Sequence, residues 1–318
     1  MDTLLSKYRG CLFGLAIGDA LGAPVEFLSL SQIRKTYGET GITDFHGWSG
    51  FKPGSYTDDT QMALATAWGC TDFKKRLNMG ETTEPSLIVR QRYLEWLRSQ
   101  DDPFQRRAPG NTCISALRSG KMGSISRRIT NSKGCGGVMR TAPAGLAFPP
   151  GEAFKWGAEF AAITHGHPSG YLPAGFLSEL IAWIIEGKPL TESIELSLQA
   201  LVKYIEYEET LEKVRIALKL ASANRPVIES IRTIGEGWVG EEALAVSLYC
   251  SLMYSDNWCA SVLAAVNHSG DSDSTGSITG AILGTYLGVE AIPEQWIRDV
   301  ENSETIQKIA SDMFNSFA

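Results

Sequence analysis

Two short segments, far apart in the sequence, gather carboxylates and hydroxyls directly before a helical pattern. They are residues 55–60 (SYTDDT) and residues 270–276 (GDSDSTG). One Asp, Ser or Thr is enough to cap a helix N-terminus, so two carboxylates in each segment exceed what capping needs. Carboxylate and hydroxyl oxygens, without cysteine pairs or paired histidines, are ligands for hard cations such as Mg²⁺, Mn²⁺ or Ca²⁺. We therefore hypothesise a metal site, with helix capping alone as the alternative.

The number of carboxylates favours two metal ions over one. One Mg²⁺ usually takes one or two carboxylates, whereas the two segments supply Asp58, Asp59, Asp271 and Asp273. Four suit two ions roughly 3.5–4 Å apart that share a bridging carboxylate. An EF-hand loop is excluded because its twelfth position, which must be a bidentate Glu, is Ile282. Paired ions orient substrate oxygens and acidify a bound water, so the pattern predicts a hydrolytic site.

A glycine-rich turn is a candidate anion site. Lys133 is followed by Gly134, Gly136 and Gly137, and Arg140 comes three residues later. Backbone N–H groups of such a turn can hold a phosphate, and the two basic side chains would add positive charge. Glycine turns before helices are also common without any ligand. No Walker motif or GxSxG elbow accompanies this one.

A second candidate ligand-binding segment is residues 164–171 (THGHPSGY), between two helical patterns. It places His165, Ser169 and Tyr171 together in a loop with glycine and proline. A histidine at the end of a helix is often only a partner for the helix dipole, so both interpretations stay open.

Glycines at every fourth position indicate how the acidic segments could meet. The two ladders are Gly10, Gly14, Gly18 and Gly22, and Gly276, Gly280, Gly284 and Gly288. Each glycine inside a helix costs about 1 kcal/mol relative to Ala, so close packing must compensate. We infer that the two ladders pack against each other or against a shared neighbour. Antiparallel packing of the ladders would bring Glu26, after the first, beside Asp271, before the second. Tight core packing without functional consequence is the alternative.

The hydrophobic periodicity is almost entirely helical. Apolar residues recur at intervals of three and four through most of the chain, and residues 42–46 are the only short strand candidate. No loop has the composition of a linker. We therefore predict an all-α fold of roughly a dozen helices or more, forming a single domain over residues 1–318.

Composition excludes several classes of protein. The chain has 318 residues, of which 43% are hydrophobic and 20% charged, which rules out a disordered or fibrous chain. The net charge of −7 argues against general binding to nucleic acid or to anionic membranes. Six scattered cysteines without a CxxC pair, and no apolar stretch of about 18–20 residues, favour a cytoplasmic protein. The oligomeric state is not determined by the sequence, and we favour a monomer.

Several motifs together resemble the ADP-ribosylglycohydrolase family, which includes dinitrogenase reductase-activating glycohydrolase and ADP-ribosylarginine hydrolases. They are RGCLFGLAIGDALGAPVEF, SYTDDTQMALA, SKGCGGVMRTAPAGL, THGHPSGY and NHSGDSDSTGSITGAILGTYLG, in the family's order from about residue 9 to residue 290. The resemblance implies a compact all-α fold with two Mg²⁺ ions, or Mn²⁺ in their place. It implies metal ligands at Thr57, Asp58, Asp59, Asp271, Asp273 and Ser274.

The same resemblance implies roles for other residues. Glu26 corresponds to a flexible acidic residue near the metals, and Glu26, Asp58 and Asp273 are the expected catalytic residues. The glycine turn with Lys133 and Arg140, and the segment with His165, Ser169 and Tyr171, resemble walls of an ADP-ribose cleft. Cys135 departs from the family pattern, since Asn is common there, and Ser274 replaces the more frequent Thr.

The implied reaction is hydrolysis at C1″ of ADP-ribose linked to a protein side chain. The expected substrate is an ADP-ribosylated protein, most often modified on arginine, and free ADP-ribose is the product. Two alternatives remain: the same chemistry on a serine, O-acetyl or nucleobase linkage, or a catalytically silent ADP-ribose-binding homologue.

Overall fold

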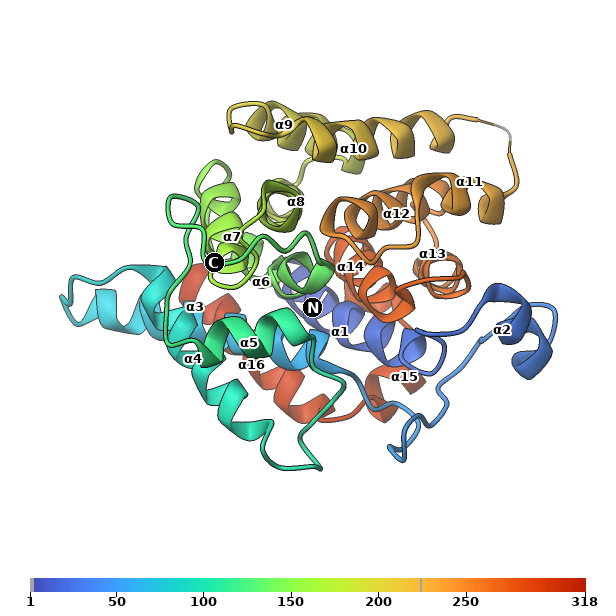
Figure 1. The fold of residues 1–318 in the computed structure, drawn as a ribbon, viewed down its shortest axis with the longest axis horizontal. Coiled ribbons are helices and arrows are strands. Elements are labelled where there is room, and N and C mark those ends of the chain that lie inside the picture. Colours follow the sequence, from blue (N-terminus) through green and yellow to red (C-terminus); the bar gives the residue numbers. More distant parts are fainter. Residues whose placement is uncertain (1–2, 224) are drawn as a thin grey trace.

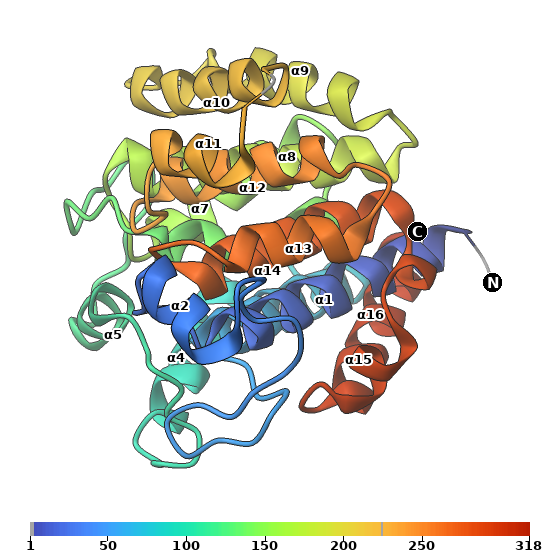
Figure 2. The same cartoon turned by 90° about the vertical axis from the view of Figure 1, so that its right-hand side faces the viewer.

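The computed structural model describes residues 3–223 and 225–318, and within them the fold is all-α, as predicted. The helices stack in rough layers (Figures 1 and 2). Helices α9 and α10 cover α8, α11 and α12; the pair α1 and α14 lies beneath these, and α3, α4 and α16 form the opposite side. The α-helices are α1 (Thr3–Gly22), α2 (Leu30–Tyr37), α3 (Asp58–Asn78), α4 (Pro85–Ser99), α5 (Asn111–Arg118), α6 (Ala142–Ala147), α7 (Glu152–Ala162), α8 (Pro168–Ile185), α9 (Leu190–Leu201), α10 (Glu208–Ala221), α11 (Val227–Ile234), α12 (Gly240–Met253), α13 (Trp258–Val266), α14 (Ser272–Leu287), α15 (Glu294–Asp299) and α16 (Ser303–Phe317).

Two short 3₁₀ helices complete the described elements, η1 (Cys135–Arg140) and η2 (Val289–Ala291). The strand candidate at residues 42–46 does not form a strand, and the described residues contain only isolated β-bridges. Ile42 is instead fixed by Asn267, whose side chain bonds both backbone groups of Ile42, at 2.8 and 2.9 Å. The side-chain amide thus occupies the backbone groups that a neighbouring strand would need.

The two glycine ladders pack against each other, which is one of the two arrangements expected, and their orientation is antiparallel. A Cβ atom on Gly10 would come within 1.9 Å of the Gly284 carbonyl oxygen, and one on Gly18 within 2.1 Å of that of Gly276. Between these contacts, Gly14 faces Gly280 in the same way. The helix axes can approach this closely only because no side chain separates the backbones. Consequently the end of α1 lies beside the beginning of α14.

A continuous hydrophobic core surrounds this pair. It includes Phe13 of α1, Met62 of α3, Phe176 of α8 and Met313 of α16, all buried, and therefore connects helices from both ends of the chain. A smaller cluster lies between α10, α11, α12 and α13. In the described part of the chain, no helix combines the length and apolar character required to cross a membrane.

Candidate active site

The site begins with the N-termini of α3 and α14, each capped by one of the predicted metal ligands. The Thr57 hydroxyl accepts a bond from the Asp59 amide at 3.2 Å. The Asp271 carboxylate accepts one from the Ser274 amide at 3.3 Å. Capping therefore accounts for Thr57 and Asp271 but not for the carboxylates of Asp58 and Asp59, which is the surplus that the sequence indicated.

The two acidic segments converge, although more than 200 residues separate them in the sequence. The Ser274 hydroxyl donates a hydrogen bond of 2.8 Å to the Asp59 carboxylate. Glu26, Asp271 and Asp273 each offer a carboxylate oxygen, and these oxygens lie within 4.8 Å of one another. The prediction that antiparallel ladders bring Glu26 to Asp271 is thus confirmed. Packing of α1 on α14 places Glu26 beside the second acidic segment.

Glu26, Asp58, Asp59, Asp271 and Asp273 form what we call the acidic cluster, and their carboxylates are crowded and poorly solvated. Burial, followed by the charge of Asp273, raises the pKa values of Asp58, Asp59 and Asp271 well above their usual range. Burial also raises the pKa of Glu26, and the neighbouring charges acting on it are those of aspartates. Concentrated negative charge away from water is unfavourable unless protons or a cation neutralise it. The donors are carboxylate and hydroxyl oxygens, so the cluster fits a hard divalent cation.

Asp19 is a member of this cluster that the sequence analysis missed. It lies on α1, is fully buried, and accepts bonds from the amides of Thr57 and Thr60, at 2.9 and 3.0 Å. The Thr60 hydroxyl donates a third, at 2.5 Å. Burial and the charge of Asp273 outweigh these bonds and raise the pKa of Asp19 to about 7. A single carboxylate within an otherwise glycine-rich, apolar helix was the available signal.

The glycine-rich turn forms η1 and lies against the acidic cluster. Cys135, its first residue, donates from Sγ to the Asp271 carboxylate at 2.7 Å, and its amide bonds the Trp238 carbonyl at 3.2 Å. A Cβ on Gly137 would meet the Gly170 carbonyl oxygen at 2.4 Å. Gly137 is therefore required for close packing against the segment that contains His165.

Arg140 does not have the predicted position at a ligand surface. Its side chain is fully buried, and its guanidinium bonds the Thr164 hydroxyl at 2.7 Å and the Phe160 carbonyl at 3.1 Å while lying over the Tyr93 ring. These contacts connect η1 to α7 and α4. Arg140 thus stabilises the wall of the site from behind, and we correct its assignment as a ligand contact.

Lys133 remains on the surface near the turn, but it is already paired. Its ammonium group contacts both carboxylate oxygens of Glu209, at 2.6 and 2.8 Å. The Ser169 hydroxyl donates to the same carboxylate. Exposed ion pairs of this kind are weak, so the pair can open toward an anionic ligand.

The other predicted cleft residues are mostly buried. His165 lies behind the turn, where its Nδ1 pairs with the Thr164 hydroxyl at 2.8 Å, and burial together with the charge of Arg140 lowers its pKa to about 3. Ser169 and Tyr171 are also buried, within the first turn of α8. A neutral His165 imidazole packs against Gly134 and Gly136 and fixes the position of the turn.

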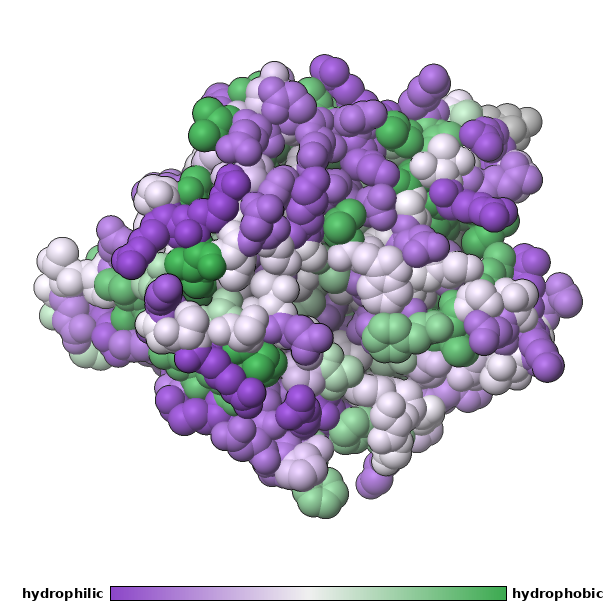
Figure 3. Space-filling model, in the orientation of Figure 1, coloured by the Kyte–Doolittle hydropathy of each residue, from purple (hydrophilic) through white to green (hydrophobic). Residues whose placement is uncertain are grey.

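An exposed aromatic pair forms one rim of the acidic cluster. Phe27, directly after Glu26, is 75% exposed, and Trp238 is 38% exposed. Their rings stack at 5.6 Å between centroids with an interplanar angle of 17°. Figure 3 shows the face of the molecule seen in Figure 1. Hydrophilic side chains gather in its upper part, and side chains of intermediate hydropathy occupy the middle, over α5, α6 and α14. The stacking connects the segment after α1 with the loop before α12.

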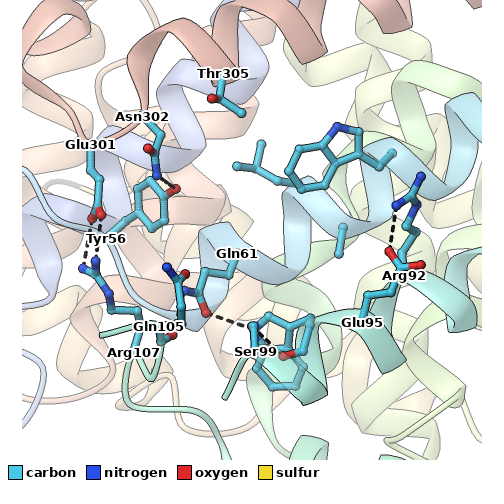
Figure 4. A pocket seen from close by; sticks show the side chains of 14 residues that line it. Tyr56, Gln61, Arg92, Glu95, Ser99, Gln105, Arg107, Glu301, Asn302 and Thr305 are labelled. Atoms are coloured by element: carbon cyan, nitrogen blue, oxygen red, sulfur yellow. Dashed lines mark hydrogen bonds and ion pairs between the residues drawn. The ribbon is translucent and has the colours of Figure 1, made fainter. Parts of the chain in front are cut away.

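A separate cavity of about 470 Å³ lies on the outer face of α3, beside α4 and α16 (Figure 4). Its charged groups are paired with one another: Arg107 binds Glu301 through two contacts of 2.9 and 2.7 Å, and Arg92 binds Glu95 at 2.7 Å. The Gln61 side chain accepts a bond from the Trp96 indole. This cavity has a different character from the acidic cluster and does not contain any of the predicted site residues.

Comparison with known proteins agrees with this fold. The family model described as ADP-ribosylglycohydrolase matches residues 1–318. An ADP-ribosyl-[dinitrogen reductase] glycohydrolase from Rhodospirillum rubrum is 26% identical, over 92% of this chain and 89% of that protein. The ADP-ribosylarginine hydrolase Tri1 from Serratia proteamaculans is also 26% identical, over 98% and 79% of the two chains.

A solved structure titled "ADP-ribosylglycohydrolase-related protein complex" has the same fold, with a TM-score of 0.76, 23% identity and full coverage of both chains. The chain belongs to the ADP-ribosylglycohydrolase family. It is therefore an enzyme of the hydrolase class that acts on glycosidic bonds of ADP-ribose.

Proposed function

We propose that this enzyme removes ADP-ribose from modified proteins, acting on the N-glycosidic bond to arginine and releasing free ADP-ribose. The observation that carries the proposal is the convergence of the N-termini of α3 and α14, with Glu26, into one buried acidic cluster. The names of two relatives, which refer to ADP-ribosylarginine and ADP-ribosyl-[dinitrogen reductase], support the choice of substrate.

The same cluster supports a site for two Mg²⁺ ions, with Mn²⁺ as a substitute. The residues that would hold them are Thr57, Asp58, Asp59, Asp271, Asp273 and Ser274. When bound, the ions supply positive charge that orients the distal ribose hydroxyls and favours ionisation of a water near C1″. Asp19, which binds the backbone on both sides of Asp58, keeps the first of these segments in place.

Glu26 is suited to proton transfer because it is less buried than the aspartates beside it. It belongs to the turn after α1 and not to a helix, so its carboxyl can adjust to a substrate. A carboxyl near C1″ can accept the proton of the attacking water and deliver a proton to the leaving nitrogen. Asp58 and Asp273, at helix N-termini, are held more rigidly and are suited to positioning.

The pyrophosphate of ADP-ribose must lie away from the carboxylates, because the like charges repel each other. The turn at Gly134, Gly136 and Gly137 borders the cluster through Cys135. The Gly134 amide already bonds the Ser132 hydroxyl, so the amides of Gly136 and Gly137 are the donors proposed for that side. Lys133 lies on the same segment and can exchange Glu209 for a phosphate. Ser169 shares that Glu209 contact, whereas His165 and Tyr171 support the wall from within.

The test is release of ADP-ribose with Mg²⁺ from substrates linked through arginine, serine, an O-acetyl group or a nucleobase. We expect release from the arginine linkage, and loss of activity with a chelator. Asp58→Asn and Asp273→Asn should each reduce activity about a hundredfold, or about 3 kcal/mol in barrier. Asp72→Asn is the matched control: it changes an aspartate further along α3 that pairs with Arg92, and it should retain activity.

The outcomes separate the alternatives. Release from another linkage only would reassign the substrate within the same chemistry. No release from any substrate, with Mg²⁺ binding intact, would identify a silent ADP-ribose-binding homologue. Full activity of either Asn variant would remove that aspartate from the metal-binding set.

A further inference from the structure

Cys135 occupies a position unlike that of the other cysteines in the chain. Cys11, Cys70, Cys113 and Cys250 are buried, and Cys259 is partly buried on α13. Cys135 instead directs its sulfur at the Asp271 carboxylate, 2.7 Å away. The Ser274 hydroxyl lies 3.7 Å from the same sulfur and bonds the Asp59 carboxylate on its other side. The thiol therefore contacts two residues of the second acidic segment, and one of them, Ser274, bonds the first segment at Asp59.

The backbone holds the thiol in this direction. The Cys135 amide bonds the Trp238 carbonyl at 3.2 Å, and the preceding Gly134 forms an isolated β-bridge with Val239. Behind the turn, Gly137 packs on the Gly170 carbonyl. Contacts on both sides of Cys135 thus fix the start of η1 relative to α8 and to the loop before α12.

We propose that Cys135 is a sulfur ligand of the metal site, which lets this enzyme bind divalent cations softer than Mg²⁺, such as Co²⁺, Zn²⁺ and Cd²⁺, more tightly than an all-oxygen site would. The inference rests on the metal site of the proposed function and adds one residue to it. Thiolate favours softer cations, whereas carboxylates and hydroxyls suit Mg²⁺ and Mn²⁺. One sulfur among oxygens therefore widens the range of cations without excluding Mg²⁺.

The binding step is a simple exchange. The sulfur–hydrogen bond breaks, a metal–sulfur bond forms, the proton leaves to solvent, and no atom changes oxidation state. Zinc lies about 2.3 Å from a thiolate and about 2.0–2.2 Å from a carboxylate oxygen, so the two donors on one ion are roughly 3–3.6 Å apart. From the present 2.7 Å, the Cys135 and Asp271 side chains need to separate by less than about 1 Å.

The test compares Co²⁺ and Cd²⁺ binding to metal-stripped wild type, Cys135→Ser and Cys259→Ser. Wild type and Cys259→Ser should show a sulfur-to-cobalt charge-transfer band in the near ultraviolet, and Cys135→Ser should not. By calorimetry, Cys135→Ser should bind Cd²⁺ about tenfold or more weakly, while its Mg²⁺ affinity changes less than about threefold. A Mg²⁺-induced rise in melting temperature in the Ser variant checks that its fold and remaining ligands are intact.

The results distinguish this inference from the proposed function. If Co²⁺ binds wild type without the band, or if Cd²⁺ affinity is the same in Cys135→Ser, sulfur is not a ligand although the metal site exists. If neither Mg²⁺ nor Co²⁺ binds wild type, the metal site itself is wrong and both proposals fail.

Discussion

Helix α3 contributes to two regions that differ in how their charges are arranged: one contains ion pairs, and the other contains like charges. On its outer face, the cavity beside α4 and α16 contains Arg107, which forms two contacts with Glu301. At its N-terminus, Asp58 and Asp59 face Asp271 and Asp273 of α14, and the aspartate charges raise one another's pKa values. The cavity has internal ion pairs, whereas the acidic cluster has like charges in close proximity.

This difference is more informative about function than cavity volume. A cation paired with an anion satisfies both groups within the protein and leaves little charge for a ligand. Buried like charges raise the free energy of the folded state until something from outside neutralises them. The acidic cluster therefore requires a proton or a metal ion, and the cavity on the outer face does not.

The largest expected effect is on the pH dependence of stability in the metal-stripped protein. Folding raises the pKa of Asp19 from 3.8 to about 7. Its contribution to the free energy of unfolding is therefore fully present below about pH 4 and is lost as the pH rises toward 7. The raised pKa values of Asp58, Asp59 and Glu26 act in the same direction. Thermal unfolding from pH 5 to 8 should show falling stability with chelator, and Mg²⁺ should restore more stability at pH 8 than at pH 5.

Asp58→Asn, which removes one of these charges, is the matched variant for that measurement. It should flatten the decline with pH and reduce the stabilisation by Mg²⁺. Equal stabilisation by Mg²⁺ at both pH values would show that the carboxylates do not bind the ion as a cluster.

Glu301→Gln tests the ion pairs of the cavity on the outer face of α3. It leaves Arg107 without its carboxylate in a partly buried position, so we expect a loss of about 2 kcal/mol in the free energy of unfolding. The kcat/KM should stay close to wild type, because the pair lies outside the acidic cluster. Glu95→Gln is the control: its pair with Arg92 is more exposed and should contribute less than about 1 kcal/mol.

Urea unfolding and initial rates, measured on the same samples, check both statements. A large loss of kcat/KM in Glu301→Gln without loss of stability would show that the two faces of α3 are functionally coupled. The Arg107 carbonyl, which accepts a bond from the Asp58 amide, is the route by which that could occur.

Much of the architecture could be predicted because it depends on local patterns. Helical periodicity indicated the all-α fold. Four-residue glycine spacing predicted that each ladder packs closely on the other or on a shared neighbour, because close packing must compensate for so many glycines. The structure shows the first arrangement, in antiparallel orientation, and Glu26 lies beside Asp271 as expected for that orientation.

The remaining features depend on which way a side chain points, and the sequence does not contain that information. Arg140 was expected to contact a phosphate because it follows a glycine turn, but it lies on the inner side of η1 and bonds Thr164. Asp19 was missed because its partners, the amides of Thr57 and Thr60, are about 40 residues away.

The smallest expected effect is on kcat/KM and concerns Phe27, which directly follows Glu26, the residue proposed for proton transfer. Stacking on Trp238 holds the segment that carries Glu26 beside the aspartates of the acidic cluster. Phe27→Ala should therefore lower kcat/KM about fivefold with little change in stability, because the ring is 75% exposed. Phe104→Ala, which removes a similarly exposed ring near Arg107, should leave kcat/KM unchanged.

A double-mutant cycle with Trp238→Ala tests whether the two rings act through their stacking or each contact substrate independently. If the two rings act through each other, the double variant should lose no more activity than the more impaired single variant. Additive losses would mean that each ring contacts substrate independently. In that case Glu26 is positioned by its own backbone, and the pairing of α1 with α14 is sufficient to keep it beside Asp271.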